Sequence, residues 1–226
     1  MTALASCFPQ GLAGPADCLA GLALLACARQ ERAEPHAAGA APLSADLEDV
    51  RASVDGDGEA YRRLIERHQG LVAALMWRFS RDPETHEELV QDVFVQAYLS
   101  LRTYRGEAPF AHWISRVAVR AGYRFWKQRQ RERSRAALSL EEWNGLPAQS
   151  PEAMEPSQAA EIVHRLLGRL PVRDRLVLTL RYLEDRSVEE TARLTGWSET
   201  MVKVQTWRAR GKLRKFLERE KVRGMP

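Results

Sequence analysis

Helical spacing of apolar residues runs through the chain from about Leu47 onward, and no convincing period-two alternation interrupts it. Between Asp57 and Phe79, the apolar side chains recur at intervals that place them on one face of a helix. Prolines, glycines and capping residues separate such stretches where helices are expected to begin and end. Because a sheet would need an alternation that is not present, the sequence predicts an all-α protein.

Three long helices are expected in the first part of this pattern. The first spans 57–79, and the second spans 82–101. Asp82 is a natural N-cap for the second helix, Pro83 suits its first position, and acidic residues in the next turns favour the positive end of the helix dipole. A stretch with glycine and proline then breaks the chain, and a third long helix begins near Phe110.

Residues 134–158 have the composition of a linker, with three prolines and four Glu against one Arg. Shorter helices are expected behind it, over 159–170 and over 171–184. We therefore predict two small helical domains, at 46–133 and 159–223, joined by a flexible acidic linker.

The first 45 residues form an Ala-rich leader that is compositionally distinct from the rest. Its apolar run, 18–28, is too short to span a bilayer, and no Lys or Arg precedes it as in a signal peptide. We expect a disordered extension, or one that the natural product lacks because translation starts later. All three cysteines lie here without a CxxC pair, which fits a protein of the reducing cytoplasm.

A helix-turn-helix motif is predicted near the C-terminal end. Ser187 and Glu190 have the spacing of a capping box at the start of its first helix. Gly196 can end that helix in the left-handed conformation, and Ser198 can cap the next. The result is two helices joined by a tight turn, the arrangement that places a second helix in the DNA major groove.

The second helix of this motif has an apolar face and an opposite basic face on a helical wheel. The apolar face consists of Val202, Thr206, Ala209, Leu213 and Phe216. The residues predicted to contact a DNA duplex are Thr200, Lys203, Val204, Trp207, Arg208, Arg210 and Arg214. Cations suit phosphates, and polar or aromatic tips suit base edges. The alternative is a basic terminal helix whose Trp packs against a neighbour.

The third long helix is also strongly basic. Between Arg116 and Arg135 it carries eight cations against Glu132 alone. Cations interleaved with aromatic rings suit unpaired nucleic acid, because the cations hold the backbone and the rings stack on bases. The predicted members are Trp113, Arg116, Arg120, Tyr123, Arg124, Trp126, Lys127 and Arg131. The alternative for the aromatic rings is packing inside the domain.

No HExxH, phosphate-binding loop or plausibly spaced carboxylate pair is present. We therefore expect no enzymatic activity, no metal and no cofactor. A helix-turn-helix regulator that binds duplex DNA without a polymerase remains an alternative function. It accounts for residues 187–215 and leaves the basic helix at 113–131 unexplained.

Taken together, the chain resembles the extracytoplasmic-function class of bacterial sigma factors over residues 57–220. The resemblance rests on five ordered segments: "GEAYRRLIERHQGLVAALMWRF", "DPETHEELVQDVFVQAY", "YRGEAPFAHWISRVA", "LPVRDRLVLTLRYLEDRSVEETARLTG" and "MVKVQTWRARGKLRK". It implies a region 2, a linker and a region 4. It also implies binding to core RNA polymerase, reading of minus-thirty-five duplex and melting of the minus-ten element.

The resemblance assigns roles to three helices. Residues 198–214 match the minus-thirty-five reading helix, and the helix around 113–131 matches the part that opens the minus-ten element. The helix at 82–101 would dock on the β′ clamp of polymerase, or else be a plain amphipathic core helix. Its implied polymerase-contacting residues are Glu87, Glu88, Leu89, Gln91, Asp92 and Phe94.

The implied partners are promoter DNA, core RNA polymerase through its β′ clamp helices and β flap, and an anti-sigma factor that no residue identifies. No small-molecule substrate and no membrane insertion are implied.

Two departures from the family pattern stand out. Arg120 and Arg124 occupy places where many relatives have Asn and Asp, which implies a different minus-ten preference. Val204, Gln205 and Thr206 replace the more usual Ser, Arg and Leu, which implies altered base contacts and looser packing of the reading helix.

Overall fold

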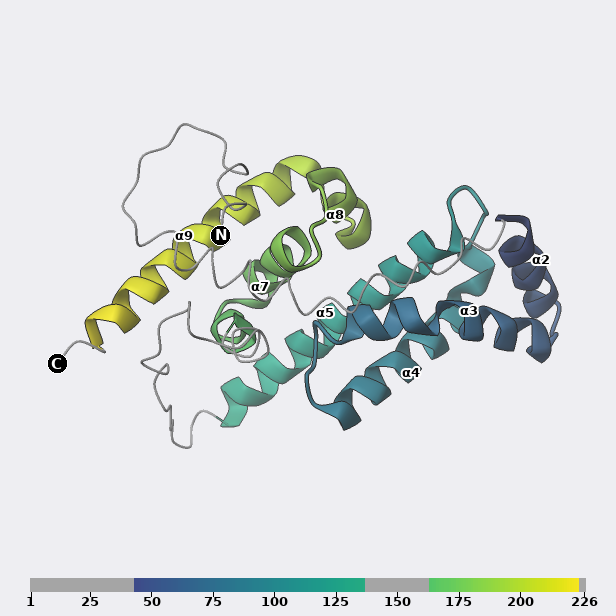
Figure 1. Ribbon diagram of the computed structural model, residues 1–226, viewed down its shortest axis with the longest axis horizontal. Coiled ribbons are helices and arrows are strands. Elements are labelled where there is room, and N and C mark those ends of the chain that lie inside the picture. The colour runs from purple at the N-terminus through teal and green to yellow at the C-terminus, as the bar shows by residue number, and fades with distance from the viewer. Residues whose placement is uncertain (1–42, 137–162, 224–226) are drawn as a thin grey trace, which may run out of the picture.

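The computed structural model describes residues 43–136 and 163–223, and all regular secondary structure in those ranges is helical (Figure 1). The N-terminal block contains α2 (Leu43–Val54), α3 (Gly58–Met76), α4 (Pro83–Ser100), the 3₁₀ turn η1 (Leu101–Thr103) and α5 (Phe110–Ala136). The C-terminal block contains a helical stretch at 163–168, α7 (Val172–Leu178), the π-helical segment η3 (Thr179–Leu183), α8 (Val188–Thr195) and α9 (Glu199–Arg223). The all-α prediction is confirmed.

The predicted helix starts follow from local capping. The Asp57 carboxylate accepts hydrogen bonds from the backbone N–H groups of Glu59 and Ala60, so α3 begins at Gly58. Asp82 accepts from the N–H of Thr85 at 2.9 Å, and Pro83 occupies the first turn of α4. These carboxylates satisfy N–H groups that have no partner inside the helix.

Helix α2 was not among the predicted helices. Its Asp46 and Asp49 are buried and form ion pairs with Arg67 on α3, and Arg63 also reaches Asp49 at 2.5 Å. The Nε2 atom of His68 lies 3.2 Å from Asp46 Oδ2. Two buried carboxylates interrupt the apolar pattern that identifies a core helix, which explains why the sequence pattern does not reveal α2.

The limits of the helices also differ from those predicted at the edges of the blocks. Helix α2 begins at residue 43, within the predicted leader, and α5 continues to residue 136, within the predicted linker. The predicted helix over 171–184 is present as α7 followed by η3, with Pro171 as its N-cap. Residues 1–42 and 137–162, which hold the rest of the leader and the linker, lie outside the described residues.

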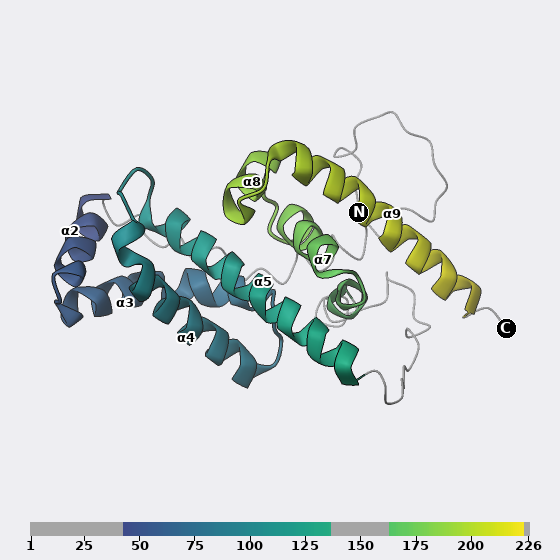
Figure 2. The same ribbon diagram turned by 180° about the vertical axis from the view of Figure 1, so that it is seen from behind.

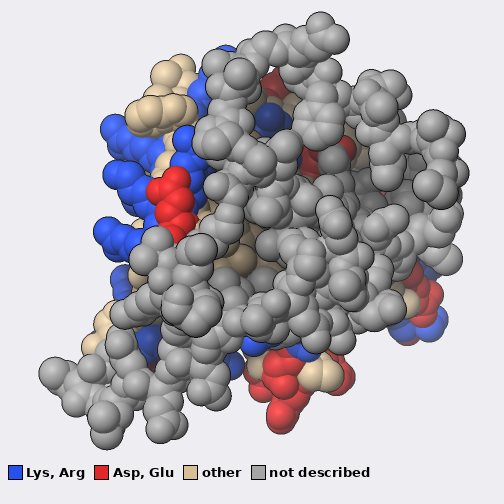
Figure 3. All heavy atoms as spheres, turned by 60° about the vertical axis from the view of Figure 1, so that its left-hand side comes forward, with Lys and Arg blue, Asp and Glu red and all other residues tan. Residues whose placement is uncertain are grey.

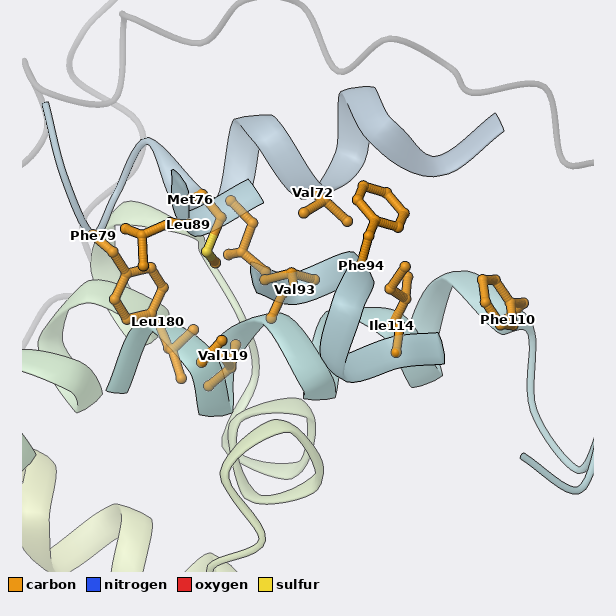
Figure 4. Close-up of a cluster of buried hydrophobic side chains, with 14 of the residues drawn as sticks. Val72, Met76, Phe79, Leu89, Val93, Phe94, Phe110, Ile114, Val119 and Leu180 are labelled. Atoms are coloured by element: carbon orange, nitrogen blue, oxygen red, sulfur yellow. The ribbon is translucent and has the colours of Figure 1, made fainter. Parts of the chain in front are cut away.

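Each block has a buried apolar cluster. In the N-terminal block, side chains from α3, α4 and α5 interdigitate around Val72, Val93 and Ile114 (Figure 4). In the C-terminal block, Val202 and Ala209 of α9 pack against a cluster that includes Leu178 of α7. Of the face of α9 predicted to be buried, Val202, Ala209 and Leu213 are buried, and Thr206 and Phe216 are half-buried.

Helix α5 forms the side of the N-terminal block that contacts the C-terminal block. Figures 1 and 2 show α3 and α4 along one side of α5 and α7 and α8 along another, and contacts join α5 to all four helices. The apolar cluster of the N-terminal block continues into the C-terminal block through Val172, Leu176 and Leu180. The position of α5 therefore decides which of its side chains can reach a ligand.

Candidate nucleic-acid interface

The helix-turn-helix is built as its sequence predicts. Ser187 and Glu190 form the capping box in both directions, with bonds of 3.0 and 2.7 Å. Gly196 ends α8 with φ +76°, a left-handed conformation that glycine adopts without strain. The Ser198 hydroxyl accepts a hydrogen bond from the N–H of Met201 and so caps the start of α9.

The Glu190 carboxylate is an acceptor in this capping box. The N–H of Ser187 holds the pKa of Glu190 below its ordinary value of 4.5. Glu190 is therefore charged at neutral pH, at the positive end of the α8 dipole.

All seven residues predicted to contact a duplex lie exposed on one side of α9. Trp207 is the most exposed large apolar side chain of this face, at 76%, and Val204 is 41% exposed. The Lys203 ammonium lies 3.8 Å from Glu199 one turn earlier, an exposed pair that adds little stability. An indole and several cations thus project together from a helix whose other side is buried. We call this surface the α9 face, and its members are Thr200, Lys203, Val204, Trp207, Arg208, Arg210 and Arg214.

Helix α9 is held in place by a buried carboxylate of α7. Asp174 is fully buried and accepts a hydrogen bond of 2.5 Å from Gln205 Nε2. It also forms an ion pair with Lys212, whose Nζ lies 2.6 Å away. Gln205 thus contacts α7, and the expected looser packing of α9 stays a prediction. The side chain that departs from the family pattern supplies a bond to the neighbouring helix.

The five cations predicted on α5 are all exposed: Arg116, Arg120, Arg124, Lys127 and Arg131. Lys and Arg side chains gather along the left edge of the view in Figure 3, which brings forward the side of the molecule on which α9 ends in Figure 1. Trp113 and Tyr123 are half-buried, and Trp113 packs near the rings of Phe110 and Tyr104 with centres 5.3 and 5.7 Å apart. These two rings keep part of their surface free for a base.

Trp126 does not belong to the exposed surface of α5, contrary to the prediction. It is 3% exposed, its Nε1 donates a hydrogen bond of 2.8 Å to the Phe79 carbonyl, and its ring packs on that of Phe79. The packing alternative is correct here, because α5 has a second buried side toward α7.

Helix α4 presents an acidic and apolar surface. Glu87, Glu88, Gln91 and Asp92 are exposed. Leu89 and Phe94 are core residues, 4% and 7% exposed, and this corrects their assignment to a polymerase contact. Both side chains point into the cluster of α3 and α5 (Figure 4).

Three exposed apolar residues of α4 were missed: Val95, Tyr98 and Leu99, at 55, 51 and 73%. Val95 and Leu99 continue the line of Glu88 and Asp92 at spacings of three and four residues. This helical spacing was the available signal. Large exposed apolar side chains on one helix face indicate a protein-binding surface. We call Glu88, Asp92, Val95 and Leu99 the α4 stripe.

Within residues 43–136 and 163–223, no group of His, Cys, Asp and Glu side chains has an arrangement that could hold a metal ion. No helix in the same ranges is both long enough and apolar enough to span a membrane.

Comparison with protein families matches two parts of the chain. Residues 64–132 match sigma-70 region 2, and residues 160–213 match sigma-70 region 4. Together the two matches cover more than half of the sequence.

Curated relatives include the RNA polymerase sigma-H factor of Pseudomonas aeruginosa, at 29% identity over 72% of this chain and 89% of the relative. The extracytoplasmic-function sigma factor SigM of Mycobacterium tuberculosis is 28% identical over 76% of this chain and 84% of its own length. The sigma-E factor of Escherichia coli strain K12 is 29% identical over 69% and 85%. A solved structure of CnrH with the cytosolic domain of CnrY has a TM-score of 0.49 at 23% identity, covering 77% of this chain and 97% of that chain.

Proposed function

The chain belongs to the extracytoplasmic-function class of sigma-70 factors, which work with core RNA polymerase in promoter-specific transcription, and we propose that three of its surfaces divide this work. The α9 face reads the minus-thirty-five duplex. The exposed cations of α5, with Trp113 and Tyr123, hold the separated strand of the minus-ten element. The α4 stripe binds the β′ clamp of polymerase.

The reading role of α9 rests on one observation. Trp207 is exposed among cations, on a helix whose opposite side packs against α7. A helix that enters the major groove has to present cations to phosphates and specific side chains to base edges. The bonds that Gln205 and Lys212 donate to Asp174 hold α9 against α7, so the exposed face is presented in one orientation.

The role of α5 follows from its line of cations. Its exposed guanidinium and ammonium groups can follow the phosphates of one strand, while the half-buried rings accept unstacked bases. In this proposal the chain catalyses no reaction of its own. Binding of the separated strand offsets the cost of taking a base out of the stack, which is about a few kcal/mol.

Core polymerase and promoter DNA are thus the first two partners, and the setting is the bacterial cytoplasm, where both occur. Membership of the family also supports an anti-sigma factor as a third partner. A helix-turn-helix regulator that acts without polymerase is not favoured, because it leaves the region 2 match at 64–132 without a function.

Run-off transcription tests the function as a whole. The purified chain is added to bacterial core polymerase that lacks any sigma factor, with a library of genomic fragments as template. Discrete promoter-dependent transcripts are expected, and their start sites identify the promoter elements. If no transcript forms while the protein still shifts duplex DNA, the chain acts without polymerase and the proposal fails.

Two variants separate the polymerase surface from the DNA surface. The Leu99→Asp variant on α4 should no longer co-elute with core polymerase, but it should still bind duplex DNA. Val204→Asp on α9 should show the reverse, because an anionic side chain in the groove repels phosphates. Each variant is the control for the other. Loss of both activities in either variant would contradict the division of roles.

A third variant tests the strand-binding role of α5. Arg116, Arg120 and Arg124 are changed together to Gln, which should leave duplex binding by the C-terminal block intact and stop promoter opening. Opening is followed by permanganate reactivity of unpaired thymines on the promoters found by run-off transcription. Normal reactivity in the triple variant would exclude this role.

A further inference from the structure

Val204 is an apolar side chain on the surface of α9. It is 41% exposed and lies in the second turn of the helix, one turn after Thr200 and one turn before Arg208. Within residues 199–219, Val204 and Trp207 are the two large apolar side chains that are exposed. A single exposed valine is ordinary on a protein surface, but this one lies on the part of α9 that would enter the DNA major groove.

The major groove offers one apolar feature to such a side chain. Each base pair presents hydrogen-bond donors and acceptors there, and thymine adds its C5 methyl group. A valine side chain has no donor or acceptor, so it would remove water from a polar base edge without replacing the lost hydrogen bond. Contact with a thymine methyl group instead removes apolar surface of both groups from water, which is favourable.

The direction in which Val204 projects is fixed by its neighbours. Gln205, the next residue, donates a 2.5 Å hydrogen bond to the buried Asp174 of α7, and Lys212 binds the same carboxylate from further along α9. A valine in a helix also has one strongly preferred side-chain rotamer. Little conformational freedom is therefore lost when Val204 meets a base, and this favours a contact with one particular group.

The residues around Val204 suit the rest of the groove. Lys203 precedes it and Arg208 follows one turn later, and both are exposed cations. Trp207 lies three residues further on, on the same side of the helix, and is 76% exposed. Contacts from cations to phosphates set the position of a helix on the duplex but carry no sequence information. An apolar side chain placed among them can add a preference for one base.

We propose that Val204 reads the C5 methyl group of a thymine in the minus-thirty-five element, so that thymine is preferred at one position of the promoters that this protein uses. The inference rests on the reading role proposed for the α9 face. Serine is more usual at this place in the family pattern, and a serine hydroxyl would prefer a polar base edge. The thymine preference therefore belongs to this chain and comes from one of its departures from the pattern.

The test uses minus-thirty-five duplexes taken from promoters found by run-off transcription. Each thymine in turn, on either strand, is replaced by deoxyuridine, which lacks only the C5 methyl group and keeps the same pairing edge. Fluorescence anisotropy at fixed salt gives the affinity of the full chain for each duplex. At one position, loss of the methyl group should weaken binding about fourfold, the fold-change that corresponds to about 0.8 kcal/mol for one buried CH₂-sized group.

Three variants link the methyl effect to Val204. Val204→Ala shortens the side chain, so it should bind the thymine and deoxyuridine duplexes with nearly equal affinity. Val204→Ile keeps a branched apolar side chain and should retain the difference of about fourfold. Lys203→Ala is the matched control at the adjacent exposed position. It should weaken binding to both duplexes by the same factor and leave the difference between them unchanged.

The outcomes separate this inference from the proposed function. If the wild type binds every substituted duplex as tightly as the unsubstituted one, the inference is overturned while the reading role of α9 remains. A methyl effect of the same size in Val204→Ala would assign the effect to another side chain or to DNA shape, and would also overturn it. If the wild type does not bind the unsubstituted duplex, the reading role fails and the inference fails with it.

Discussion

The indole of Trp126 donates a 2.8 Å hydrogen bond to the main-chain carbonyl of Phe79, and the two rings pack with centres 4.4 Å apart. This contact ties α5 to the segment that directly follows α3. A tryptophan in a strongly basic helix is therefore part of the core, while Trp207 in the other basic helix is part of the surface.

The two tryptophans should respond differently to truncation. Trp126→Ala removes a buried ring and should lower the free energy of unfolding by about 3–5 kcal/mol. Trp207→Ala changes an exposed side chain and should stay within about 0.5 kcal/mol of the wild type. Urea denaturation followed by circular dichroism measures both. Similar losses for the two variants would contradict the burial described for Trp126.

Duplex binding should depend on the α9 face. Trp207→Ala and Arg208→Ala should each weaken binding to the minus-thirty-five duplex by about 1–3 kcal/mol, because each removes a contact in the groove. Arg219→Ala, an exposed cation more than one turn beyond Arg214, the last predicted contact, controls for the loss of charge alone. Anisotropy titrations at fixed salt provide the comparison. Equal weakening by all three would indicate a general charge effect and not a reading face.

Two glycines inside helices should respond to Ala with opposite signs. A Cβ on Gly122 of α5 would overlap the ring of Phe79, which Trp126 holds in place, so Gly122→Ala should destabilise by about 1–3 kcal/mol. A Cβ on Gly70 of α3 meets nothing within 4 Å, so Gly70→Ala should stabilise by about 0.5–1 kcal/mol. Thermal unfolding distinguishes these outcomes, and a stabilised Gly122→Ala would exclude the close approach of α5 to Phe79.

Acid should lower the free energy of unfolding through His164. Partial burial of the ring, and then the nearby cations Arg81, Arg175 and Arg78, lower the pKa of this imidazole from 6.5 to about 3. Below pH 6.5 the unfolded chain takes up a proton at this position that the folded chain does not accept until about pH 3. The free energy of unfolding therefore falls as pH decreases across this window, and it is unaffected by this group above it.

The measurement is a series of urea midpoints from pH 6.5 down toward pH 3. His164→Gln should show a shallower decline than the wild type, because it removes the group that titrates. His112→Gln, which changes an exposed histidine of α5, should follow the wild type. A decline in His164→Gln as steep as that of the wild type would assign the acid sensitivity to other groups.

Features set by neighbouring residues could be predicted from the sequence. The capping residues Asp82, Ser187 and Ser198 act within a single helical turn, so their pattern is visible in a short window. The exposed face of α9 was also predictable, because within residues 43–136 and 163–223 α9 packs along one side and its apolar residues mark that side.

Features set by distant partners could not be predicted in the same way. Val119 shares a buried cluster with Leu176 and Leu180, and Trp126 contacts Arg175 as well as Phe79. The helix that holds Arg175 begins some fifty positions later, so no local sequence pattern predicts these contacts. Leu89 and Phe94 were assigned to a polymerase contact because of their positions in the family pattern. Their side chains instead belong to the apolar face of α4 that packs in the core. The bond from Gln205 to Asp174 joins residues far apart in the chain, so it has no local signature.

The charged contacts of α2 have a practical consequence for fragments of this protein. The region 2 match starts at Leu64, yet Arg67 and His68 within that match find their carboxylate partners at Asp46 and Asp49. A fragment cut at the edge of the match would keep the cations and discard both carboxylates. A fragment that keeps these contacts therefore has to include α2, which starts at Leu43, some twenty residues ahead of what sequence similarity marks.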